Sequence, residues 1–145
     1  MPTDKKDKTI YILREFVDTR CHFLYDQYKC GWTEEYVTNY FCNDGYFALT
    51  YSNLDLTFRN ERGTFFLDFC SQHDRKRGRY SIGLFKFIMV NDGSFTAIMN
   101  DENIRFLREN LDKIDDLLSE SKLEATIALL KKAMNVRMKK MFPKK

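Results

Sequence analysis

Two pairs of cysteine and histidine are the side chains of this 145-residue chain best suited to metal chemistry. Cys21 is followed directly by His22, and Cys70 stands three positions before His73, so thiols and imidazoles are available as ligands. The spacings match no zinc module, and adjacent residues on a helix point about 100° apart, which separates Cys21 from His22. We therefore expect free thiols in a reducing compartment, with no bound metal and no cofactor.

Carboxylates are the next candidates, because they can act as general acids and bases. Asp68 lies within an aromatic segment, where burial would raise its pKa. Arg59 stands on the predicted partner strand, so a cross-strand ion pair is the simpler explanation for Asp68. The remaining adjacent acids fall on predicted helix surfaces: Glu34-Glu35 and Asp115-Asp116.

The sequence motifs of common enzyme classes are missing. The chain contains neither a GxGxxG nor a GxxxxGK[ST] phosphate-binding loop, and it has no GxSxG nucleophile motif. A catalytic triad would have to use one of only two histidines, and neither has a local signature. The sequence therefore predicts no catalytic residue and no enzyme activity.

Basic residues are concentrated in two segments, although the net charge is only +3. Residues 71–79 form a polar, base-rich stretch, and residues 131–145 (KKAMNVRMKKMFPKK) contain no acid. Basic groups at the end of a helix favour its macrodipole and remain solvated, but they can also bind phosphates. The alternative function is thus a nucleic-acid-associated accessory protein. Its phosphate-binding residues would be Arg75, Lys76, Arg77, Lys139 and Lys140.

The elements that must position these residues are organised around residues 54–70. Apolar and polar side chains alternate over residues 54–59, which predicts a strand with one buried face. A polar turn at residues 60–63 leads into an aromatic second strand at residues 64–70. A further strand at residues 46–51 completes a predicted three-stranded antiparallel meander.

Helical spacing marks both ends of the chain. Residues 8–28 carry one apolar stripe, and a Thr-Glu-Glu capping pattern predicts a second, shorter helix from Thr33 to about Phe41. Residues 81–90 fit either a strand or a buried helix, and the spacing of their apolar residues favours the helix.

Two amphipathic helices follow in the C-terminal third. The first has its apolar stripe at residues 104–118, with Asn100 or Asp101 as the N-cap. The second covers residues 123–141, and we expect its methionine-rich seam to be core. A short polar link between them predicts an antiparallel αα-hairpin.

These elements predict one α+β domain over residues 1–145. A small antiparallel sheet of about three to four strands would pack with the N-terminal helix and the C-terminal αα-hairpin. No apolar run approaches the roughly 18 residues of a membrane helix, and the N-terminal MPTDKKDK lacks the apolar core of a signal peptide. We therefore expect a cytoplasmic protein without a membrane partner.

Three segments resemble small bacterial immunity proteins of contact-dependent growth inhibition and other polymorphic toxin systems. They are residues 57–69 (TFRNERGTFFLDF), residues 104–126 (IRFLRENLDKIDDLLSESKLEAT) and residues 139–143 (KKMFP). The resemblance implies a non-catalytic protein that binds and neutralises one cognate toxin domain. We expect the contacts on the hairpin turn and the acidic helix: Glu61, Arg62, Asp112, Asp115 and Asp116.

Charge is the departure from this resemblance. Inhibitors of nuclease toxins are typically acidic, since they complement a basic substrate groove. This chain is mildly basic, so an inhibitor role of that kind would use the acidic face of residues 101–120.

Overall fold

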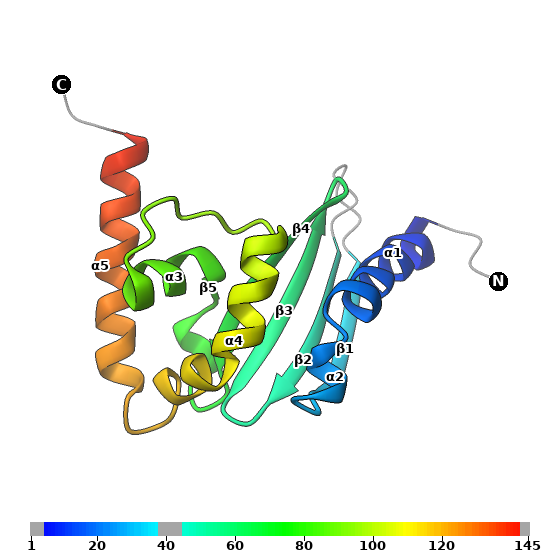
Figure 1. Ribbon diagram of the computed structural model, residues 1–145, viewed down its shortest axis with the longest axis horizontal. Helices are drawn as coiled ribbons and strands as arrows, with labels where there is room; N and C mark the ends of the chain where they lie inside the picture. The colour runs from blue at the N-terminus through cyan, green and yellow to red at the C-terminus, as the bar shows by residue number, and fades with distance from the viewer. Residues whose placement is uncertain (1–4, 38–44, 143–145) are drawn as a thin grey trace.

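The computed structural model describes residues 5–37 and 45–142, and it has an α+β fold (Figure 1). The chain begins with two helices, continues through four strands, and ends with helices that follow a short fifth strand. The elements are α1 (Lys5–Arg20), α2 (Phe23–Asp26), β1 (Gly31–Val37), β2 (Gly45–Tyr51), β3 (Leu54–Glu61), β4 (Thr64–Ser71), the 3₁₀ turn η1 (Arg75–Arg77), β5 (Tyr80–Ser81), α3 (Ile82–Val90), α4 (Asp101–Leu117) and α5 (Leu123–Met141).

Within the described residues, five strands form one antiparallel sheet in the order β1-β2-β3-β4-β5. Each strand pairs with its neighbour along the chain, which is a meander. The predicted strands β2, β3 and β4 are confirmed. The predicted number of three to four strands is wrong, because β1 and the two-residue β5 extend the sheet at its edges.

The helix predicted from Thr33 to about Phe41 is wrong over residues 33–37, which belong to β1. The pairing of β1 with β2 runs from Gly31 opposite Thr50 to Val37 opposite Gly45. Residues 38–41 lie outside the described part of the chain. The capping pattern is a local signal, whereas pairing with β2 depends on residues further along the chain and overrides it.

The central hairpin has a two-residue turn. Glu61 lies opposite Thr64, so Arg62 and Gly63 connect β3 to β4. Both have positive φ, 54° for Arg62 and 86° for Gly63. Positive φ at both central positions is the mark of a type I′ turn, which matches the natural twist of paired strands.

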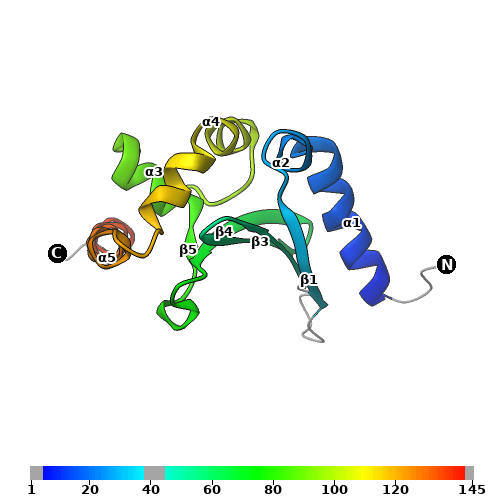
Figure 2. The ribbon, with the colours of Figure 1, turned by 90° about the horizontal axis from the view of Figure 1, so that it is seen from below.

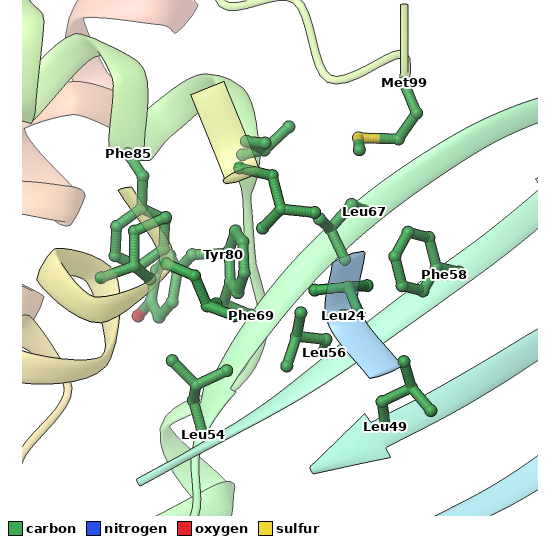
Figure 3. Close-up of a cluster of buried hydrophobic side chains, with 14 of the residues drawn as sticks. Leu24, Leu49, Leu54, Leu56, Phe58, Leu67, Phe69, Tyr80, Phe85 and Met99 are labelled. Carbon is green, nitrogen blue, oxygen red and sulfur yellow. The ribbon is translucent and has the colours of Figure 1, made fainter. Parts of the chain in front are cut away.

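Helices cover one face of the sheet. Figure 2 shows α1, α2 and α4 on the same side of the curved strands. The side chains of the sheet that point toward them form a hydrophobic core (Figure 3). Its fully buried members include Leu24, Leu49, Leu54, Leu56, Phe58, Leu67, Phe69 and Phe85.

The helical segments differ from the sequence expectation at both ends of the chain. The helix predicted over residues 8–28 is divided into α1 and the one-turn α2. The helix at residues 81–90 is confirmed as α3. The two predicted C-terminal helices are confirmed as α4 and α5, but they do not pack mainly on each other as an αα-hairpin would, because α3 lies between them and contacts both (Figure 1).

The methionine-rich seam of α5 is buried only in part. Leu123, Ile127 and Leu130 belong to the core as predicted, but Met134, Met138 and the rest of the seam are exposed. The prediction that the whole seam is core is therefore wrong from residue 134 onward. The reason is geometric, since α5 extends beyond the end of α3 (Figure 1). Within residues 5–37 and 45–142, no helix has the length and apolar character to cross a bilayer.

Candidate functional site: a groove between α3, α4 and α5

A groove of about 470 Å³ opens between three helices. Its apolar side chains come from the end of α3, the end of α4 and the second turn of α5, and its charged side chains all come from α4. The lining residues are Ile88, Met89, Asp112, Lys113, Asp116, Leu117 and Leu129. The groove can therefore accept an apolar group while presenting two carboxylates at its edge.

The sequence of α4 fixes which side chains face the groove. The Asn100 side chain accepts a hydrogen bond from the Asn103 backbone N–H at 2.9 Å, which confirms the predicted N-cap and starts the helix. The stripe that includes Leu107 and Leu111 is fully buried in the core. This burial turns the charged positions of the last turns toward the surface and the groove.

Two acids at the groove end of α4 hold the β2–β3 turn. The Asp115 carboxylate accepts a hydrogen bond from the Asn53 backbone N–H at 2.7 Å and another from the Asn53 side chain at 3.3 Å. Asp112 accepts a hydrogen bond from the Tyr51 hydroxyl, and this bond raises the pKa of Tyr51. Asp115 therefore connects elements, whereas Asp112 combines this role with a place at the groove.

Asp116 has a simpler environment. Its carboxylate pairs with the Lys122 ammonium, and both side chains are more than half exposed. An exposed ion pair of this kind is weak and exchanges with solvent, so Asp116 remains available to a partner. The structure thus brings Asp112 and Asp116 together at the groove, with Asp115 beside them.

The hairpin turn lies far from this groove. Glu61 and Arg62 are at the β3–β4 end of the sheet, whereas Asn53 and the acids that contact it are at the β2–β3 end. The two ends are separated by the eight residues of β3, which is about 26 Å of extended chain. A single small contact cannot include both predicted sets of residues.

The predicted cross-strand ion pair is confirmed. Arg59 Nε lies 2.6 Å from Asp68 Oδ2, and the Arg59 guanidinium also pairs with Glu61. The same guanidinium lies over the Phe66 ring, 5.0 Å from its centre. Asp68 therefore stabilises the hairpin as one member of an ion pair.

The basic residues of η1 are drawn into ion pairs with other elements. Arg75 pairs with Asp55 on β3, with an N–O distance of 2.7 Å, and Arg77 pairs with Glu124 on α5 at 2.8 Å. Lys76 between them is exposed. These pairs anchor the η1 loop to the sheet and to α5, so two of its three cations already have anionic partners.

The two predicted phosphate-binding lysines of α5 have different contacts. Lys140 Nζ donates a hydrogen bond to the Gly93 carbonyl at 2.5 Å, which ties the loop after α3 to α5. Lys139 is exposed on another side of the helix. The residues 75–77 and 139–140 belong to different elements and do not form one cluster with the groove.

The cysteines of the described residues are buried free thiols. Burial raises the pKa of Cys21 to about 12 and the pKa of Cys30 to about 12. Burial also raises the pKa of Cys70, with the Asp55 carboxylate as a second cause. At neutral pH these thiols are protonated, which makes them poor nucleophiles. The fourth cysteine, Cys42, lies outside the described residues.

The two histidines have separate partners. His22 Nε2 lies 3.0 Å from Asp26 Oδ2, and His73 Nε2 lies 2.7 Å from the Asn53 side-chain oxygen. Among the described residues, no three His, Cys, Asp or Glu side chains come together as a metal site would require.

Five residues of the groove were not among the predicted contacts: Ile88, Met89, Lys113, Leu117 and Leu129. Leu129 is the least expected of them. It lies off the apolar stripe of α5, and it is 47% exposed. A single apolar residue on the polar side of an amphipathic helix is common, so the sequence alone gives no signal that Leu129 lines a groove. Leu129 becomes part of a site only together with Ile88 and Met89 from α3. The sequence does not show that α3 lies beside α5.

No protein-family model, curated protein or solved structure matches the chain.

Proposed function

We propose that this protein is a non-catalytic immunity protein, which binds a cognate bacterial toxin domain at the groove between α3, α4 and α5 and neutralises it. The observation that carries the proposal is the combination of an apolar lining with two carboxylates, Asp112 and Asp116. The resemblance of residues 57–69 and 104–126 to immunity proteins supports the same function.

Charge supports a basic partner surface. The helix α4 carries six acids and three bases, so its outer face has an excess of negative charge. Acids at the rim of a contact attract a basic partner during diffusion and exclude partners with the wrong charge. A toxin domain with a basic substrate cleft has the complementary surface.

The apolar lining supplies the part of the contact that resists salt. An apolar anchor of the partner would displace water from Leu117 and Leu129, and well-packed central pockets carry most of the free energy of an interface. A stable complex buries about 800 Å² on each partner. The groove would therefore be the centre of a wider contact that includes the exposed face of α4.

The test starts with purification of the tagged chain from a lysate of its source with washes at high salt. We expect one protein to be retained at equal stoichiometry, to be toxic when it is produced alone, and to lose toxicity when this chain is present. Substitution Leu129→Arg should weaken the complex by roughly thirtyfold, as for a central hot-spot residue.

The matched control is Ile12→Arg, because Ile12 is an exposed apolar residue on α1, on the other side of the molecule (Figure 1). This variant should bind the toxin as the original chain does. The proposal is wrong if no protein survives the wash, if the retained protein stays toxic, or if Leu129→Arg and Ile12→Arg bind equally. Recovery of nucleic acid that elutes with salt would favour the alternative function instead.

A further inference from the structure

The last turns of α5 project from the body of the protein (Figure 1). Five large apolar side chains are exposed there: Met134 at 38%, Val136 at 43%, Met138 at 62%, Met141 at 63% and Phe142 at 70%. Exposed apolar residues are ordinary when they are scattered, but a group of them marks a contact surface.

Val136 lies on the opposite side of the helix, whereas the other four side chains share one face. Their positions follow the spacing i, i+4, i+7 and i+8, which is the apolar pattern of an amphipathic helix. The same stripe begins with Leu123, Ile127 and Leu130, which are buried in the core. The apolar face of α5 therefore continues into the part of the helix that no other described element covers.

All charged side chains in the C-terminal half of α5 are positive. After Glu124 the sequence contains no further acid, whereas basic residues continue along both flanks of the apolar face. Those in the described part of α5 are exposed or half-buried. The basic residues are Lys131, Lys132, Arg137, Lys139, Lys140, Lys144 and Lys145. The occupant of this surface must therefore combine negative charge with an apolar interior.

We propose that residues 131–142 bind the surface of an anionic phospholipid bilayer. The methionines and Phe142 would enter the boundary between headgroups and acyl chains, and the flanking lysines would contact lipid phosphates. The contact is peripheral and reversible, and it requires no membrane-spanning helix. It is independent of the groove and of the proposed toxin partner.

Three features favour lipid over the other anionic partners. Nucleic acid offers phosphates but leaves an apolar face with four exposed side chains in water. A partner protein needs a larger area, since the stretch from Met134 to Phe142 is only about 14 Å long. Methionine is flexible and has no fixed shape, which suits a fluid surface better than a rigid interface.

The first test uses the full chain and sedimentation with vesicles. Vesicles of phosphatidylcholine with about 30% phosphatidylglycerol should bind the protein at least tenfold more strongly than phosphatidylcholine alone. The double substitution Met138→Ser, Met141→Ser should lower the partition coefficient by about fivefold or more. Its matched control is Val90→Ser, Ile98→Ser, which removes two exposed apolar side chains elsewhere and should leave binding unchanged.

The second test separates insertion from simple charge attraction. Lys132→Glu, Lys139→Glu should also abolish vesicle binding, whereas Lys29→Glu, Arg105→Glu, with the same change in charge, should lower it by less than about twofold. All four positions are exposed. Circular dichroism checks that each variant is folded.

Several results would overturn the proposal. Equal binding to both kinds of vesicle would exclude a role for the lysines, and loss of binding in the lysine variant alone would exclude insertion of the methionines. Binding of a labelled DNA duplex without binding of vesicles would identify nucleic acid as the occupant. A dimer in light scattering that the methionine variant lacks would identify a second copy of the chain.

Discussion

Two neighbouring carboxylates at the end of α4 differ in what they hold. Asp115 is half-buried and accepts two hydrogen bonds from Asn53 in the β2–β3 turn, whereas Asp116 forms an exposed pair with Lys122. Hydrogen bonds to a charged group contribute about 1.5–3 kcal/mol when they are sheltered from water. Exposed ion pairs contribute about 0–1 kcal/mol.

We therefore expect Asp115→Ala to lower the free energy of unfolding by about 2 kcal/mol, because it leaves the Asn53 N–H without its acceptor. The matched substitution Asp116→Ala should change the free energy of unfolding by no more than about 0.5 kcal/mol. Urea titration followed by circular dichroism measures both. Equal losses for the two variants would contradict the role of Asp115 in holding the turn.

The sequence predicts Asp115 and Asp116 on the same helix surface, and nothing in the sequence distinguishes the roles of these two acids. The difference arises from Asn53, which is 62 positions away from Asp115. Ion pairs across a hairpin are easier to predict, since Arg59 and Asp68 are only 9 positions apart. Thus the contact of Asp115 with Asn53 could not be predicted from the sequence, whereas the contact of Asp68 with Arg59 could.

The β3–β4 hairpin depends on the turn that closes it. Gly63 has φ of 86° and open space where a Cβ would stand, so only backbone strain opposes a larger residue there. Gly63→Ala should lower the free energy of unfolding by about 1 kcal/mol.

The control for this substitution is Gly93→Ala. Gly93 has the same open space on the side where alanine would carry its methyl group, but its φ lies outside the strained range. Thermal unfolding should show a lower midpoint for Gly63→Ala and almost no change for Gly93→Ala. A similar decrease in both variants would show that the left-handed backbone at Gly63 is not the cause.

The elements that the sequence predicted correctly are those whose own pattern determines them. Strand β3 alternates, β4 is an aromatic run that follows a turn signal, α3 has helical spacing, and α4 has a capping residue at Asn100. The strand β1 was missed because its pairing with β2 overrides a local helix signal. In α5 the period identified the apolar face correctly, but a period cannot indicate how far along the helix other elements cover that face.

At the scale of the whole molecule, buried thiols make the free energy of unfolding depend on pH in the alkaline range. Cys21 and Cys30 have pKa values raised by burial to about 12, compared with 9.0 for a free thiol. Above the pKa of a free thiol, the unfolded chain loses thiol protons that the folded chain keeps. The free energy of the unfolded state therefore falls relative to that of the folded state. The contribution of the protonated thiols to the stability of the folded state is complete below about pH 9, and it is lost as the pH rises toward about 12.

Urea titrations in the presence of reductant should therefore give a free energy of unfolding about 4 kcal/mol lower at about pH 10.5 than at about pH 8, about half from each thiol. The tyrosines act in the same direction, since the bond to Asp112 and burial raise the pKa of Tyr51. In the variant Cys21→Ala the decrease should be smaller, although the variant is less stable at both pH values. A free energy of unfolding that is constant over this range would exclude a contribution from the thiols.

The order β1-β2-β3-β4-β5 also affects how the protein can fold. Because every pairing joins consecutive strands, the sheet can form hairpin by hairpin, and each step closes only a short loop at small entropic cost. The core face of the sheet then becomes available to helices from both ends of the chain. Helix α1 leaves the ribosome before the strands that bury Leu13 and Val17 are made, so the order of synthesis differs from the order of packing.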